Sequence, residues 1–122
     1  MKPIAPAERR IASIRDTAAF TPFDPTGETE RGTAMLQLNP AAAGGTGFYI
    51  YRMEPGARSA PHSHGGAEEF VMIEGELIDN DGTVYRAGDV VWLAPGTEHC
   101  SHTETGCIIA VHAEGPETAP TG

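Results

Sequence analysis

The sequence predicts an all-β fold, built as a small sandwich or barrel. Short apolar runs recur between residues 48 and 111, and none of them is long enough for a stable helix. Turn signals such as Glu74-Gly75, Asp81-Gly82 and Pro95-Gly96 separate these runs about every 8–12 residues, as in folds made of short antiparallel strands. A chain of 122 residues can bury one core but not two, so we expect one domain.

The elements follow in order along the chain. Residues 1–30 form a weakly patterned lead segment, in which residues 8–15 could be a helical turn or a lead-in strand and Pro22 and Pro25 interrupt any regular element. The main domain covers residues 31–113. Its predicted strands are 35–38, 48–53, 70–73, 77–78, 84–85, 90–93 and 107–111, with a hairpin turn at Asp81-Gly82. Residues 114–122 are rich in Pro, Gly, Thr and Glu and predict a disordered tail.

Charge and composition exclude several partners. The chain has 17 acidic and 8 basic residues, a formal net charge of −9, which repels nucleic acid and anionic lipid. No apolar run approaches the roughly 20 residues of a membrane span, and the first residues lack the apolar segment of a secretory signal. We therefore expect a cytoplasmic protein, with Cys100 and Cys107 as reduced thiols.

A histidine pair provides the first chemical signal. His62 and His64 would face different sides of a helix, but on an extended strand they face the same side. The pair can therefore chelate a metal ion only if the segment is a strand, which Pro61 favours. Glu68 offers a carboxylate, and His99 follows a turn that could bring a later strand back across the first. By itself, a His-x-His pair is more often solvent-exposed or capping.

The spacing around this pair resembles the cupin superfamily. The first cupin motif is matched at Gly56, His62, His64, Glu68 and Gly75. Glu69 would leave one residue too few before Gly75, so Glu68 is the better candidate ligand. The second motif is matched at Gly88, Gly96 and His99, with departures at Ala94 and Thr103, neither of which is a ligand position.

A closer resemblance is to the ChrR-like cupins, which include a zinc-binding anti-sigma domain and acetylacetone-cleaving dioxygenases. It covers residues 35–112 and is carried by the stretches that begin PHSHGGAEEF and TGCIIAVHAEG. The resemblance implies a double-stranded, jelly-roll-like β-barrel that holds one divalent metal ion through His62, His64, Glu68 and His99. The ion could be Fe, Zn, Ni or Mn, since histidine-rich sites accept several first-row metals. Glu68 could also leave the metal and accept a proton.

Five further residues are candidates for the pocket wall. Phe70 and Met72 share strand parity with Glu68, while Tyr51 and Trp92 are aromatic residues of neighbouring predicted strands. For these four residues, ordinary core packing is the more common role. Arg52 could pair with an anionic substrate or form a salt bridge on the outer face.

Three functions from different classes remain at this stage. The favoured one is a metal-dependent enzyme acting on a small polar molecule, with dioxygenase-like cleavage of a β-dicarbonyl compound as the leading reaction. The second is a zinc-binding sensory or regulatory module without catalysis. The third, a metal-free ligand-binding barrel, would leave three inward histidines unsatisfied. The exposed edges of a small barrel also predict a homodimer.

Overall fold

A computed structural model describes residues 1–23 and 30–120 of the chain. Within them, the short 3-10 turns η1 (Pro6–Glu8) and η2 (Thr17–Ala19) precede the strands. The strands are β1 (Thr21–Pro22), β2 (Thr33–Leu36), β3 (Gly47–Met53), β4 (His62–His64), β5 (Glu68–Asp79), β6 (Val84–Arg86), β7 (Val90–Leu93), β8 (Glu98–His99), β9 (Ser101–His102), β10 (Cys107–Ala113) and β11 (Glu117–Thr118). The predicted all-β class is confirmed. The predicted interruption at Pro25 lies outside the described residues.

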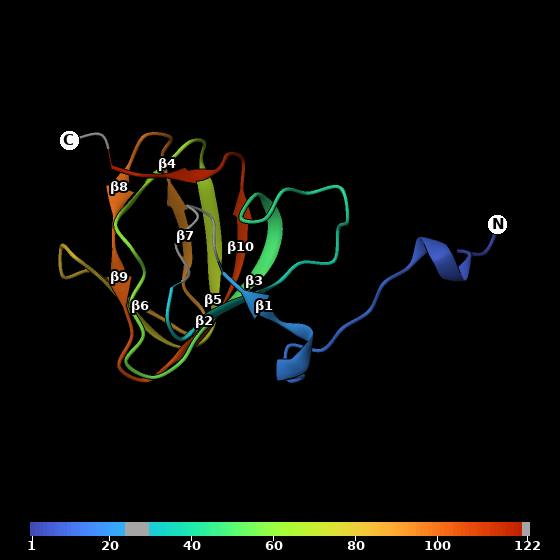
Figure 1. The fold of residues 1–122 in the computed structure, drawn as a ribbon, viewed down its shortest axis with the longest axis horizontal. Helices are drawn as coiled ribbons and strands as arrows, with labels where there is room; N and C mark the ends of the chain where they lie inside the picture. Colours follow the sequence, from blue (N-terminus) through green and yellow to red (C-terminus); the bar gives the residue numbers. More distant parts are fainter. Residues whose placement is uncertain (24–29, 121–122) are drawn as a thin grey trace.

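The strands form two antiparallel sheets. The larger has the order β1-β2-β3-β10-β5-β6, with β7 and β9 also paired to β5, and the smaller has the order β11-β4-β8. Strands β3, β10 and β5 lie side by side, while the N-terminus and η1 lie away from the barrel (Figure 1). No helix in the described part of the chain is long and apolar enough to cross a membrane.

Strand β5 is the longest element and links both ends of the barrel. Its first half pairs with β10 and β7, and its second half pairs with β6 and β9. The sequence predicts two short strands here, separated by a turn at Glu74-Gly75, but β5 runs through this point. Gly75 has a φ of 79°, and the register with β10 shifts beside it, so the turn signal marks a β-bulge.

The main core fills the barrel interior. Tyr49, Tyr51 and Met53 alternate along β3 and face Phe70 and Met72 of β5 within one buried cluster. This is the period-two pattern of strands with one face inside. The inward face therefore carries the residues that surround the candidate site.

The lead segment covers part of the outer face of the large sheet. Ile14 and Phe20 pack against a second buried cluster formed by Leu36, Ile50 and Ile108. Residues 8–15 include neither a complete helical turn nor a strand, because η1 ends at Glu8 and η2 begins at Thr17.

The C-terminal segment differs from the disordered tail that its composition predicts. Glu117–Thr118 form β11, which pairs with β4 through Glu117↔His64 and Thr118↔Ser63. Glu117 is only 8% exposed. The segment is held by backbone hydrogen bonds to β4, and composition carries no information about such bonds. Residues 121–122 of the predicted tail lie outside the described residues.

Candidate metal centre

The structure brings the four predicted ligands into one cluster centred on His64, which is grouped with His62 and His99 on one side and with Glu68 on the other. His62 and His64 lie on β4 with both side chains buried, and His99 on β8 is the cross-strand partner of His62. The ring centroids of the three histidines are 4.6–5.0 Å apart. Their nearest ligand atoms all lie within 4.8 Å of one another. Glu68 opens β5, and its Oε2 is 3.2 Å from Nε2 of His64.

Backbone contacts explain the convergence. The His64 N–H donates to the carbonyl oxygen of Thr97 at 2.9 Å, and the Gly96 N–H donates back to the carbonyl oxygen of His64 at 2.9 Å. The turn at Pro95-Gly96 thus brings β8 beside β4, as its sequence suggested. A short bend at Gly65-Gly66 joins β4 to the start of β5.

The Nδ1 atoms of His62 and His64 are held by oxygen acceptors. His62 Nδ1 donates to the carbonyl oxygen of Ala60 at 2.8 Å. His64 Nδ1 lies 2.9 Å from Oγ1 of Thr97, whose hydroxyl already donates to the Ala94 carbonyl at 2.8 Å, so Thr97 accepts from the imidazole. In the neutral form of each ring the proton is therefore on Nδ1, which leaves the Nε2 lone pair free for a metal ion.

His99 is held by a buried carboxylate. Its Nδ1 donates to Oδ2 of Asp79 at 3.1 Å. Asp79 also accepts hydrogen bonds from the hydroxyls of Ser101 at 2.5 Å and Tyr85 at 2.6 Å. Although burial raises the pKa of Asp79, the hydrogen bonds from His99, Ser101 and Tyr85 outweigh it, so the net shift is downward and Asp79 stays ionised.

The donor atoms fit a cation. Nε2 of His62, Nε2 of His64 and Oε2 of Glu68 are fully buried and have no hydrogen-bond partner among the described residues. His64 Nε2 and Glu68 Oε2 face each other as two acceptors, which is unfavourable unless a proton or a cation lies between them. Imidazole nitrogen with carboxylate oxygen suits zinc, iron, nickel or manganese.

A fifth candidate, Glu117, was missed by the sequence reasoning. Its Oε1 lies 3.4 Å from Nε2 of His62. One carboxylate oxygen of Glu117, one ligand atom of His64 and one of Glu68 also lie within 4.8 Å of one another. Both cupin motifs end before residue 117, and the flanking composition predicts disorder. Nothing local in the sequence distinguishes Glu117 from the exposed Glu114 three residues earlier.

Burial controls the charge of two of these groups. It lowers the pKa of His62 to about 4, assisted by the neighbouring His99 and His64, so the ring is neutral near pH 7. Burial also raises the pKa of Glu117 to about 8, with further contributions from Glu68 and Glu30. A bound cation would oppose the shift of Glu117, because it favours the ionised carboxylate.

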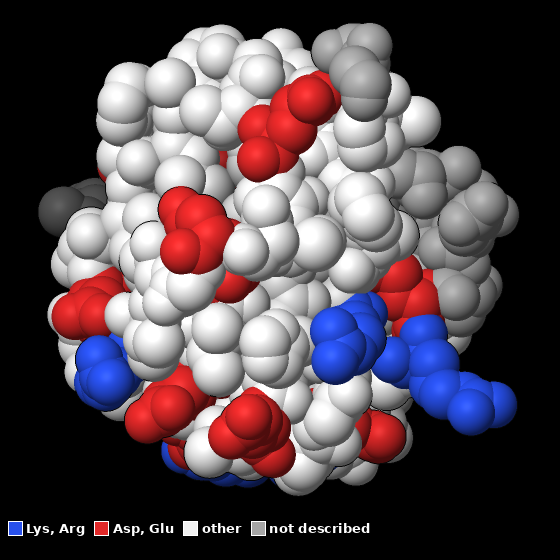
Figure 2. All heavy atoms as spheres, turned by 90° about the vertical axis from the view of Figure 1, so that its left-hand side faces the viewer, with Lys and Arg blue, Asp and Glu red and all other residues white. Residues whose placement is uncertain are grey.

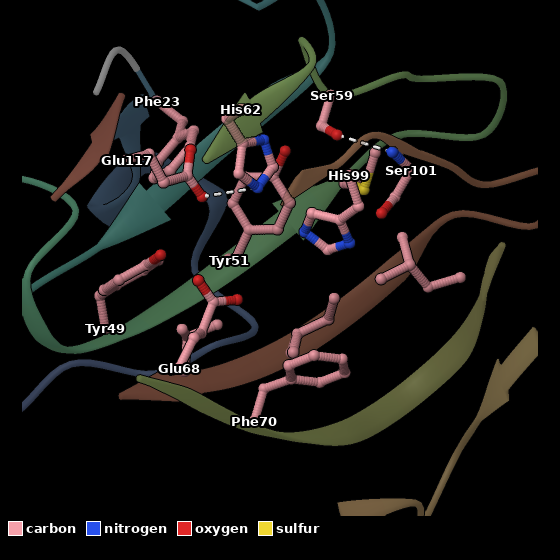
Figure 3. A pocket seen from close by; sticks show the side chains of 14 residues that line it. Phe23, Tyr49, Tyr51, Ser59, His62, Glu68, Phe70, His99, Ser101 and Glu117 are labelled. Atoms are coloured by element: carbon pink, nitrogen blue, oxygen red, sulfur yellow. Dashed lines mark hydrogen bonds and ion pairs between the residues drawn. The ribbon is translucent and has the colours of Figure 1, made fainter. Parts of the chain in front are cut away.

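A small cavity adjoins the cluster. Its wall is mostly apolar and aromatic and includes Phe23, Tyr49, Phe70, Leu77, Ile109 and Val111. His62, Glu68, His99 and Glu117 turn toward its centre (Figure 3). The Tyr51 hydroxyl on the same wall donates to Oε2 of Glu30 at 3.0 Å. The cavity therefore combines an apolar wall with one strongly polar end.

The structure brings two of the five predicted pocket residues, Tyr51 and Phe70, to this wall. Met72 is 1% exposed but packs in the core and does not line the cavity. Trp92 is 62% exposed, because it pairs with the exposed Glu69 and so faces outward from the barrel. Arg52 alternates with the inward Tyr51, which places it on the outer side of β3.

A double-stranded barrel with histidines and a glutamate directed inward defines the class of this protein as a cupin. The model of the ChrR cupin-like domain matches residues 11–116. The chain therefore belongs to the ChrR cupin-like family, which confirms the resemblance seen in the sequence. No curated protein sequence matches the chain.

Solved structures share this fold. An acetylacetone dioxygenase from Acinetobacter johnsonii matches with a TM-score of 0.71 and 17% identity, covering 89% of this chain and 76% of that one. The complex of Rhodobacter sphaeroides SigE with the anti-sigma ChrR matches with a TM-score of 0.58 and 21% identity, covering 68% and 44%. An RmlC-like cupin from Shewanella frigidimarina matches with a TM-score of 0.55 and 25% identity, covering 66% of this chain and 73% of that one. The fold is thus shared by an enzyme and a regulator.

Proposed function

We propose that this protein is a metal-dependent enzyme acting on a small anionic molecule. The observation that carries the proposal is the set of three imidazoles at the polar end of an apolar cavity. Each is anchored at Nδ1, and Nε2 of His62 and of His64 has no hydrogen-bond partner among the described residues. A purely structural metal site would not need an adjoining cavity. Small-molecule sites typically combine apolar walls with a few polar groups.

His62, His64, His99 and Glu68 would hold the ion. When bound, a divalent metal supplies Lewis-acid polarisation of substrate oxygens and, if it is iron, can assist dioxygen chemistry. Three neutral imidazoles and one carboxylate would leave the centre with a net charge near +1, which suits an anionic ligand such as an enolate. The aromatic wall would exclude water from the carbon skeleton of that ligand.

The finer proposal is dioxygenase-like cleavage of a β-dicarbonyl compound. Its support is the fold shared with the acetylacetone dioxygenase and the apolar wall beside the polar cluster. Glu68 is the candidate proton acceptor, because its buried Oε2 has no hydrogen-bond donor among the described residues. The carboxylate would take the acidic proton that lies between the two carbonyl groups.

A zinc-binding regulatory module is the second candidate. The observation that favours it is the match to the ChrR chain in the SigE complex, which covers 68% of this chain. In that case the cavity would bind an effector or nothing, and the metal would hold the barrel in one conformation.

Metal content and oxygen uptake test the proposal. Purified protein should contain close to one equivalent of a divalent metal by mass spectrometry. His62→Ala and His99→Ala should lose that metal, while His112→Ala, a control at an exposed histidine of β10, should keep it. Iron-loaded protein should consume oxygen with a β-diketone. Metal retained by both ligand variants would overturn the metal centre; a zinc-only protein without oxygen uptake would favour the regulatory module.

A further inference from the structure

The C-terminal strand places a second carboxylate at the metal cluster. Glu117 is paired in register with His64 across the β4–β11 ladder, and its side chain is 7% exposed. It comes from a segment outside both cupin motifs, so it is an addition to the four predicted ligands. Figure 3 shows its carboxylate turned toward His62.

The contact between Glu117 and His62 requires a proton or a cation between its two facing atoms. Because His62 donates from Nδ1 to Ala60, the neutral ring presents a lone pair at Nε2, and Oε1 of Glu117 lies 3.4 Å away. The 3.2 Å contact between Glu68 and His64 has the same character. Two donors about 2.1 Å from one ion lie roughly 3.0–3.4 Å apart at angles of about 90–110°, so both contacts match pairs of ligands on a shared cation.

We propose that Glu117 is a fifth protein ligand of the metal ion, delivered by β11. The inference rests on the proposed metal centre and adds to it a carboxylate from the C-terminal segment.

Close backbone contacts hold this segment in place. The Gly65 N–H donates to the carbonyl oxygen of Pro116, and the Glu114 N–H donates to that of Ala67, both at 2.9 Å. A Cβ at Gly66 would lie only 2.8 Å from the backbone nitrogen of Gly115. The glycine at position 66 is therefore needed for the close approach that carries Glu117 to the cluster.

A fifth ligand changes which molecules the centre can accept. With Glu68 and Glu117 both ionised, the two carboxylates neutralise a divalent ion. In an octahedral site, five protein donors leave one open position instead of two. A chelating anion such as an enolate must then displace Glu117, and because the anion replaces one negative charge with another, the centre stays neutral. The C-terminal strand thereby discriminates between chelating and single-donor ligands.

Titration of the metal-free protein with Co²⁺ and Zn²⁺ tests the assignment. Glu117→Gln keeps the side-chain shape but removes the charge, and Glu114→Gln is the matched control on the exposed face of the same segment. We expect Glu117→Gln to weaken binding of both ions at least roughly tenfold and to change the visible absorption of bound Co²⁺. Glu114→Gln should match the parent protein in both measurements. Parent-like affinity and an unchanged cobalt spectrum in Glu117→Gln would overturn the assignment.

Thermal melting separates a ligand from a packing residue. A ligand role predicts that Glu117→Gln melts no lower than the parent without metal but gains less stability when Zn²⁺ is added. Equal destabilisation with and without Zn²⁺ would indicate packing alone and overturn the ligand role. Gly66→Ala, which obstructs the approach of β11, should reproduce the weaker metal binding if it folds.

The same titrations distinguish this inference from the proposed function. If His62→Ala and His99→Ala lose the metal while Glu117→Gln binds it normally, the metal centre stands and only the fifth ligand is rejected. If the parent protein binds neither Co²⁺ nor Zn²⁺, the metal centre itself is rejected.

Discussion

At the scale of single residues, the acceptors behind the histidines matter as much as the ligands. Each of the three rings is oriented by an oxygen at Nδ1, and the one behind His99 is a carboxylate. A charged acceptor raises the basicity of the imidazole and strengthens its bond to a metal. We therefore infer that Asp79 is a positioning residue for the candidate metal centre.

Replacement of Asp79 by Asn should weaken metal binding roughly 10- to 100-fold, because it removes the charge behind His99 while keeping the size of the side chain. Calorimetric titration with Zn²⁺ measures the change. Asp81→Asn, at an exposed turn position two residues later, is the control and should bind as the parent does. Equal affinities for all three proteins would refute the positioning role.

The two cysteines should differ in reactivity. Burial raises the pKa of Cys107 to about 11, although hydrogen bonds with Thr103 and Met53 oppose the shift, so almost no thiolate is present at pH 8. Cys100 is partly exposed. Iodoacetamide at pH 8 should therefore add one group to the native protein and two after unfolding, as counted by mass spectrometry. The native Cys100→Ser variant should gain no adduct. An adduct on that variant would contradict the burial of Cys107.

The raised pKa of Cys107 also makes the stability of the folded protein depend on alkaline pH. The raised pKa means that the folded state keeps the Cys107 proton at a pH where the unfolded chain loses it. The contribution of the protonated thiol to folding stability is fully present below pH 9 and is lost as the pH rises through about 11. Cys107→Ser should show a weaker decline in melting temperature over that range.

At the scale of elements, β5 joins the two ends of the barrel and contributes both Glu68 and Asp79 to the metal centre. It can span that distance because the bulge beside Gly75 bends it without ending it. A Cβ at Gly75 would collide with the carbonyl oxygen of Gly106. This glycine is thus required by both its positive φ and its close contact.

Gly75→Ala should lower the free energy of unfolding by about 3 kcal/mol or more, because strain at φ 79° and a backbone collision add together. Gly82→Ala is the matched control, since it has a similar φ of 87° but open space around it, and should cost only about 1 kcal/mol. Urea unfolding of both variants measures the difference. Similar losses in the two would show that the contact with Gly106 is unimportant.

At the scale of the whole molecule, the surface is acidic and one sheet face is partly apolar. Acidic side chains are scattered over the face in Figure 2 and outnumber the basic ones, in keeping with the net charge of −9. On the outer face of β3, β10, β5 and β7, the register aligns Phe48, His112, Glu69 and Trp92 in one row. Phe48 and Trp92 are each 62% exposed, and Val90 is 78% exposed. This face is the best location for the predicted homodimer contact.

Light scattering should give twice the chain mass of 12.9 kDa if the homodimer prediction holds. Trp92→Glu, which places a second carboxylate beside Glu69 at the end of this row, should then yield the monomer. Glu104→Lys, at an exposed turn position, is the control and should stay dimeric. A monomeric parent protein would contradict the prediction, and a dimeric Trp92→Glu would move the interface elsewhere.

Local patterns determined the fold class and four of the site residues. Alternating apolar residues and turn pairs predicted the strands because strand periodicity and turn chemistry act over a few residues. The sequence predicted four candidate ligands because two short motifs with fixed spacing contain them: His62, His64, Glu68 and His99. The same local reasoning placed a turn at Gly75, where β5 instead continues past a bulge at residues 73–74.

Tertiary structure alone decided which other side chains face the cavity or contact the candidate ligands. Whether Trp92 and Arg52 face the cavity depends on the register of β7 and β3, and a shift of one residue reverses the side on which each lies. Asp79 meets His99 only because β5 is continuous, and Glu117 reaches the cluster only because β11 pairs with β4. The sequence by itself therefore predicted the candidate metal ligands of this cupin. The three-dimensional pairing of distant strands decided which groups orient the candidate ligands and which further carboxylate lies beside them, since those contacts join residues with no local relation in the chain.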